Sequence, residues 1–109
     1  MVLYMLFSCT RSNLTDTEKR YLISGSGNEK HYLIEIIREN QKNEKLGKEP
    51  MIIFNGEILY YHYQENFEKI QILKNEIEEI EIIEKEESIL LFGSAGKFGL
   101  MRIKSNRLN

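Results

Sequence analysis

The chain has 109 residues, of which 41% are hydrophobic and 29% charged, and its formal net charge is −2. This composition is typical of one globular domain with a modest core, and it lacks the excess of positive charge that nucleic-acid binding needs. No apolar run approaches the roughly 18 residues of a membrane-spanning helix. The single cysteine excludes an intrachain disulfide and a zinc site built from cysteines.

The first 13 residues hold a short apolar run and the cysteine. Residues 2–7 are apolar and lead into the letters LFSC, which end at Cys9 and resemble a bacterial lipobox. The run is shorter than the core of a signal peptide, and no Lys or Arg precedes it. We expect residues 1–13 to be a tether with a lipid on Cys9, in a protein that starts upstream of Met1 or has an unusually short signal. The alternative is an N-terminal strand with a buried free cysteine.

Residues 14–109 are expected to form one domain that opens with a helix. Thr15 and Glu18 have the spacing of a capping box, in which each side chain accepts a hydrogen bond from a free backbone N–H. A glycine-containing loop at residues 24–28 is the clearest break in the chain. Residues 29–45 then predict a helix, although their β-branched content also suits a strand, and the letters LGKEP at 46–50 end it.

A strand and a tight turn are predicted next. Residues 51–54 are a continuous apolar run before Asn55 and Gly56, a pattern typical of a buried strand that enters a hairpin turn. The aromatic residues at 58–63 predict a second strand whose rings pack across the sheet. Exposed tyrosines that bind a sugar or a partner are the alternative.

Within residues 67–83 the apolar residues first recur at helical spacing and then alternate as in a strand. We expect a short helix near residues 75–78 and then a strand through Ile83. Seven glutamates lie between positions 76 and 87. They predict a solvated acidic face, partly paired with Lys74 and Lys85, because the spacing of a calcium-binding EF-hand is absent.

Three equally spaced glycines lie near the end of the chain, in the letters LLFGSAGKFGLMRI. Gly93, Gly96 and Gly99 fit neither a P-loop, which needs a hydroxyl after the Gly-Lys pair, nor a G-x-G-x-x-G dinucleotide site. They are therefore interpreted as structural positions, where the backbone has a positive φ or packs too closely for a Cβ. Residues 100–104 predict a final strand.

This C-terminal half resembles the end of the plug domain of TonB-dependent outer-membrane receptors, in the form common among Bacteroidetes. The letters IEEIEII at 77–83, LFG at 91–93 and the glycines at 96 and 99 align without a gap, and PMIIFNG at 50–56 resembles an upstream strand and turn. Asn55 replaces the usual Asp and Glu84 the usual Lys. The likeness covers residues 50–104, about half of the chain.

The resemblance implies a small α+β domain with a mixed sheet, helices on one face and a plug-like βαβ in the C-terminal half. In this unit a helical turn at 86–92 crosses over to the strand at 100–104, and such a crossover places neighbouring strands parallel. The implied function is binding without catalysis, with no cofactor, in a small envelope lipoprotein. Its expected location is the periplasmic or surface side of the outer membrane, and its expected partner is an outer-membrane receptor or transport protein.

A second family competes for the same residues. The letters FGSAGKFG at 92–99 are similar to a motif of bacterial PH-like membrane proteins. That alternative predicts a membrane-surface binding domain with an antiparallel meander at 58–63, 69–73 and 79–83, in which residues 88–92 are a strand. A small cytoplasmic enzyme is a third alternative. It has little support, because His31, His62 and Ser94 lie in no catalytic or metal-ligand motif.

Overall fold

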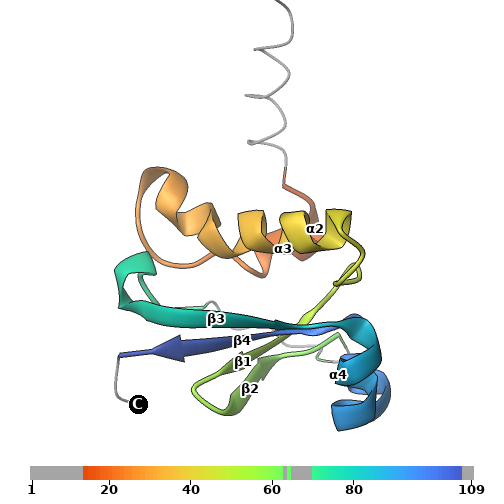
Figure 1. Ribbon diagram of the computed structural model, residues 1–109. Coiled ribbons are helices and arrows are strands. Elements are labelled where there is room, and N and C mark those ends of the chain that lie inside the picture. The colour runs from red at the N-terminus through yellow and green to blue at the C-terminus, as the bar shows by residue number, and fades with distance from the viewer. Residues whose placement is uncertain (1–13, 63, 65–69, 107–109) are drawn as a thin grey trace, which may run out of the picture.

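The computed structural model describes residues 14–62, 64 and 70–106. Figure 1 shows a sheet with two helices above it and a third at one end. The helices are α2 (Asp16–Lys19), α3 (Tyr32–Lys42) and α4 (Lys85–Phe92), and short 3₁₀ turns are η1 (Gly27–His31), η2 (Lys74–Glu76) and η3 (Gly93–Gly96). The strands are β1 (Met51–Phe54), β2 (Glu57–Tyr60), β3 (Ile77–Ile83) and β4 (Leu100–Ser105). The predicted α+β fold with a mixed sheet is confirmed.

The four strands lie in the order β2-β1-β4-β3. β1 pairs antiparallel with β2 and parallel with β4, and β3 pairs antiparallel with β4. The two central strands are β1, which is the apolar run at 51–54, and β4. Both have buried side chains on each face of the sheet. Seven of the ten residues in β1 and β4 are buried, three in β1 and four in β4.

One face of the sheet is covered by α2 and α3, as predicted (Figure 1). α3 buries Leu33, Ile34 and Ile37. Their spacing of three and four residues places them on one side of the helix. They join a core that includes Ile52 of β1 and Met101 of β4. Alternate residues of a strand point to opposite faces, so this core takes every second residue of the central strands.

The other face has a smaller core at one end of the sheet. Met51, Ile53, Ile83 and Leu100 are buried there, and Phe92 of α4 packs against them. α4 is therefore not on the face that α2 and α3 cover. This placement corrects the expectation that the helices share one face, which holds for α2 and α3 alone.

The predicted strand–helix–strand order of residues 77–105 is present, but its pairing differs. The expected crossover places neighbouring strands parallel, whereas β3 and β4 are antiparallel. Ile83 and Leu100 are direct partners in the ladder. The chain therefore leaves the sheet at one end and returns at the same end, so α4 and η3 form a long hairpin connection. The parallel neighbour of β4 is β1, from far earlier in the sequence.

The hairpin turn between β1 and β2 is as predicted. Asn55 and Gly56 have φ values of 48° and 89°, the positive pair that a two-residue type I′ turn needs. The Asn55 side chain has a second role, because its Oδ1 accepts a hydrogen bond of 2.8 Å from the backbone N–H of Ser105. The turn thus fixes the end of β4 as well as the hairpin.

Several predicted boundaries shift. α3 ends at Lys42, and Glu44 rather than a glycine takes the left-handed conformation after it, with φ 64°. Gly47 is instead a contact position, because a Cβ there would lie 2.6 Å from the Phe98 ring. β2 ends at Tyr60, and the short helix expected near residue 75 is η2. Residues 1–13, with Cys9, and the predicted strand residues 63 and 69 lie outside the described residues.

Candidate binding surface

The glycine-rich turn holds α4 tightly against the sheet. Gly96 is buried against α4: a Cβ on it would lie 2.5 Å from the Ser88 carbonyl oxygen, and still closer to the Ser88 hydroxyl. Ser88 is itself fully buried. The helix and the turn therefore touch backbone to backbone, which only a residue without a Cβ allows. The interpretation of Gly96 as a structural glycine is consistent with this contact.

The two flanking glycines have positive φ. Gly99 has φ 84°, and a Cβ there would also lie 2.6 Å from Leu46 Cδ2 and 3.1 Å from the Ile83 carbonyl oxygen. Gly93 has φ 63°, and a Cβ added there would have no neighbour within 4 Å. Gly99 thus meets two requirements, conformation and close packing, whereas Gly93 meets only the first.

α4 presents an apolar surface to solvent. Ile89, Leu90 and Leu91 are exposed by 44%, 86% and 53%, whereas Ser88 on the same helix is buried. Exposed apolar side chains are ordinary when scattered singly, whereas three on one short helix give it an apolar exposed surface that suits contact with a partner. We call Ile89, Leu90 and Leu91 the α4 ridge.

Sequence reasoning missed the α4 ridge, although a signal for it was present. The letters ILLF at 89–92 are apolar, and a surface helix buries only one stripe of its circumference. Four consecutive apolar residues on a short helix cannot all face the core. Here only Phe92 does so, which leaves the other three outside.

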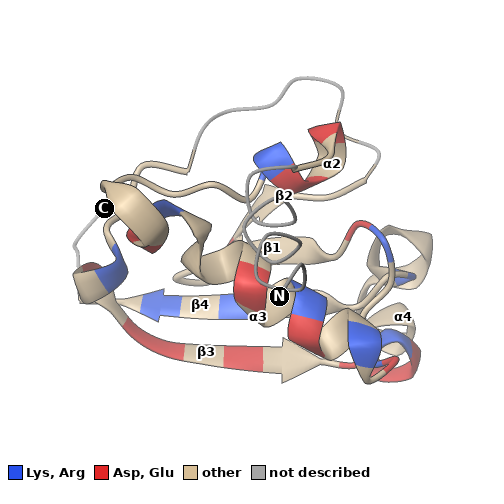
Figure 2. Cartoon of the chain, turned by 90° about the horizontal axis from the view of Figure 1, so that it is seen from above, with Lys and Arg blue, Asp and Glu red and all other residues tan. Residues whose placement is uncertain are grey.

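The long edge strand β3 carries three of the seven glutamates for which an acidic face is predicted. Figure 2 shows β3 along one border of the sheet with its acidic residues in red. Glu78, Glu79 and Glu81 are exposed. Glu81 accepts a hydrogen bond of 3.0 Å from Arg102 on β4, and Lys74 lies over the Tyr32 ring.

A polar cluster joins the end of α2 to β2. The Arg20 guanidinium donates to Glu49 at 3.1 Å and also to the Tyr60 hydroxyl, which in turn donates to Glu49 at 2.5 Å. Burial is the main cause that raises the pKa of Tyr60, followed by its hydrogen bond to Glu49. Beside it, the Tyr21 hydroxyl donates to the Pro50 carbonyl at 2.7 Å, and burial raises its pKa well above the ordinary range. The tyrosine rings pack edge to face, so this cluster stabilises the fold.

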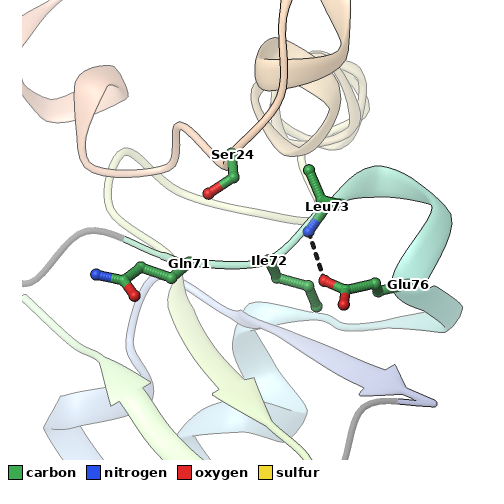
Figure 3. A pocket seen from close by; sticks show the side chains of 5 residues that line it. All are labelled: Ser24, Gln71, Ile72, Leu73 and Glu76. Atoms are coloured by element: carbon green, nitrogen blue, oxygen red, sulfur yellow. Dashed lines mark hydrogen bonds between the residues drawn. The ribbon is translucent and has the colours of Figure 1, made fainter.

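A shallow hollow of about 370 Å³ lies beside η2. Figure 3 shows its lining residues Ser24, Gln71, Ile72, Leu73 and Glu76. The Leu73 N–H donates to Glu76 at 2.9 Å, and the Ser24 N–H donates to the Ile72 carbonyl at 2.9 Å. These hydrogen bonds hold the walls of the hollow together, so we interpret it as a structural feature of the fold.

Among residues 14–62, 64 and 70–106, no group of three or more potential metal ligands comes together. No helix in the same ranges is long and apolar enough to cross a membrane. The His62 ring packs edge to face on Phe98, with 4.9 Å between ring centres, whereas His31 lies at the end of η1, before α3. The structure does not bring the two histidines together, and Cys9 lies outside its described part.

Comparison with known proteins adds no relative: the chain matches no family model, no curated protein and no solved structure at a significant level.

Proposed function

We propose that the chain is a non-enzymatic binding module of the cell envelope, similar to the plug domain of TonB-dependent receptors. A lipid on Cys9 would hold it at the outer membrane, on the periplasmic or surface side. Its partner would be an outer-membrane receptor or transport protein.

The observation that carries the proposal is the helix at residues 88–91. The gap-free plug-like alignment of residues 77–103 places a helical turn there, between a strand and three glycines, and α4 lies at that place. The PH-like alternative needs residues 88–92 to be a strand. The plug-like alignment also accounts for Pro50 to Gly56 as a strand and turn, where β1 and its hairpin turn lie.

The α4 ridge is the surface that suits the partner. It is apolar and exposed, and Gly96 fixes the helix beneath it, so little conformational freedom is lost when a partner binds. Truncation to alanine measures how much an interface residue matters for binding, and the residues that cost most lie near the centre of the interface. Leu90 is the most exposed of the three.

The partner is tested by photo-crosslinking in native envelopes. A photoreactive residue replaces Leu90 in one variant and Lys19 in the control, since the Lys19 side chain is 60% exposed on α2, away from α4. We expect Leu90 adducts with an outer-membrane barrel protein and none of these from Lys19. Adducts that are the same for both positions, or that contain only soluble proteins, would contradict the proposed partner.

The anchor is tested by the intact mass of the protein in the membrane fraction, expressed with its native upstream sequence. We expect a mature protein that begins at Cys9 and carries the mass of attached acyl chains, and we expect Cys9→Ala to leave the membrane fraction. A membrane-fraction protein that keeps the residues before Cys9 and has a free thiol would overturn the lipoprotein assignment.

A further inference from the structure

The edge strand β3 has one side without a partner strand among the described residues. β3 is the longest of the described strands, and the sheet order places it at the border, with β4 as its neighbour (Figure 2). The opposite edge strand, β2, has four residues. An unpaired strand edge carries a row of free N–H and C=O groups that can pair with another strand.

The outward groups of β3 follow from the bonds of β4. The carbonyls of Gly99 and Ile103 accept from Met51 and Asn55, so the odd-numbered residues of β4 bond toward β1. The even-numbered ones, including Arg102, therefore bond toward β3. Their partners Ile83, Glu81 and Glu79 point their backbone groups inward. The N–H and C=O groups of Ile80 and Ile82 consequently point out of the sheet.

The side chains beside this edge alternate in character. Ile80 and Ile82 are partly buried against the core under α3, whereas Glu79 and Glu81 point to the other face. On that face Glu81 pairs with Arg102, and Glu79 lies opposite Lys104. The flanking carboxylates of Glu76, Glu78, Glu84, Glu86 and Glu87 have only Lys74 and Lys85 near them in sequence. The edge is therefore acidic overall.

The acidic charge of the β3 edge favours a basic partner strand over a second copy of β3. Two copies of β3 placed edge to edge would bring glutamates against glutamates, and like charges directly opposite one another destabilise a strand pair. A strand with apolar residues on one face and Lys or Arg on the other would extend the apolar face beside Ile80 and Ile82. It would also place its cations beside Glu79 and Glu81.

We propose that β3 accepts an extended segment of a partner protein, with alternating apolar and basic residues, as a fifth strand of the sheet. The backbone groups of Ile80 and Ile82 make the new ladder, and the carboxylates of β3 select the basic segment. The inference rests on the proposed binding role, because it names a surface for it, but it does not depend on the lipid at Cys9.

The test uses amide hydrogen exchange of the ¹⁵N-labelled chain with two matched peptides. One is a capped seven-residue peptide of alternating Val and Lys, and the other has Glu in place of Lys. In the free protein we expect the amides of Ile80 and Ile82 to exchange fast and those of Glu79 and Glu81 to be protected by their pairing with β4. We expect the basic peptide to slow exchange at Ile80 and Ile82 by about tenfold or more and the acidic peptide to leave it unchanged.

A variant separates strand addition from general attraction between charges. Glu78→Gln with Glu84→Gln removes two exposed charges beside the edge without touching the pairs of Glu79 and Glu81. We expect this double variant to bind the basic peptide several-fold more weakly and with a shallower dependence on salt. The amides of Ile80 and Ile82 should remain the protected ones. Unchanged exchange at Ile80 and Ile82 with millimolar basic peptide, or equal protection by both peptides, would overturn the proposal.

The outcomes distinguish this inference from the proposed function. If the basic peptide fails while Leu90 still crosslinks to an outer-membrane barrel protein, the strand addition is wrong and the proposed function stands. If the peptide protects Ile80 and Ile82 while Cys9 carries no lipid and Leu90 forms no such adduct, the edge is a binding site and the envelope role is wrong.

Discussion

Gly96 is the residue at which a single added methyl group has the clearest consequence. Gly96→Ala puts a Cβ against the backbone of Ser88, where neither partner can rotate away. We expect the free energy of unfolding to fall by about 2–3 kcal/mol, as for other overpacked buried sites. Urea denaturation measures the change.

Ser88→Ala provides the control for that contact. It removes the hydroxyl but keeps the carbonyl oxygen that a Cβ on residue 96 would meet. The double variant Ser88→Ala with Gly96→Ala is therefore expected to remain nearly as unstable as Gly96→Ala alone. Full recovery in the double variant would mean that the hydroxyl, and not the backbone, requires the glycine.

Gly93 and Gly99 should tolerate valine unequally. Both have positive φ, where a β-branched residue is strained by about 1–3 kcal/mol. Only at Gly99 would the new side chain also meet Leu46 and the Ile83 carbonyl. We expect a lower denaturant midpoint for Gly99→Val than for Gly93→Val, and both below wild type. Midpoints equal to wild type would contradict the turn conformation.

Glu18 makes the free energy of unfolding depend on pH. Arg38 donates two hydrogen bonds to it, at 2.6 and 2.8 Å, and these bonds are the main cause that lowers the pKa of Glu18. A lowered pKa in the folded state stabilises the fold fully above the unfolded value of about 4.3, and this stability is lost as the pH falls through the folded value.

Glu18→Gln tests this link and keeps the capping geometry, since glutamine also serves at that position of a capping box. We expect a loss of about 1 kcal/mol in the free energy of unfolding at pH 7, because the side chains of Arg38 and Glu18 are still 33% and 22% exposed and solvent weakens the pair. The difference from wild type should shrink steadily below pH about 4. Urea denaturation at several pH values measures it, with Arg38→Gln as the matched variant. A difference that does not change with pH would exclude the charge as the cause.

At the scale of elements, α3 and α4 should respond oppositely to the same truncation. Leu33 of α3 is fully buried, so Leu33→Ala should cost about 2–5 kcal/mol. Leu90 of α4 is 86% exposed, so Leu90→Ala should change the free energy of unfolding by less than about 0.5 kcal/mol. Thermal denaturation compares the two. A large loss for Leu90→Ala would mean that the α4 ridge packs inside the fold.

Local signals predict the elements of this chain well. The capping box at Thr15 and Glu18 is present, with bonds of 3.1 and 3.0 Å, and the apolar run before Asn55 is β1. Each is set by neighbours in sequence, through capping or turn chemistry. The pairing of β3 with β4 is different, because the direction of a strand depends on where the chain re-enters the sheet. The glycine spacing contains no information on that geometry.

At the scale of the whole molecule, the sequence gives the class of fold but little of the binding surface. Composition and periodicity predict one α+β domain, since they reflect how much apolar surface the chain can bury. The α4 ridge and the open edge of β3 depend on which residues remain uncovered after packing. Cys9, which the sequence predicts as the lipid-bearing residue, lies outside the described residues.

The position of β4 determines when the sheet can form during synthesis of the chain. β4 is the last described strand in the chain, yet it lies between β1 and β3 and joins them. While the chain is being synthesised, the β1–β2 hairpin and β3 have no common neighbour until residues 100–105 emerge. Such distant pairing slows folding and leaves apolar edges exposed to aggregation during the delay. During synthesis the sheet therefore lacks one of its two central strands until residues 100–105 have emerged.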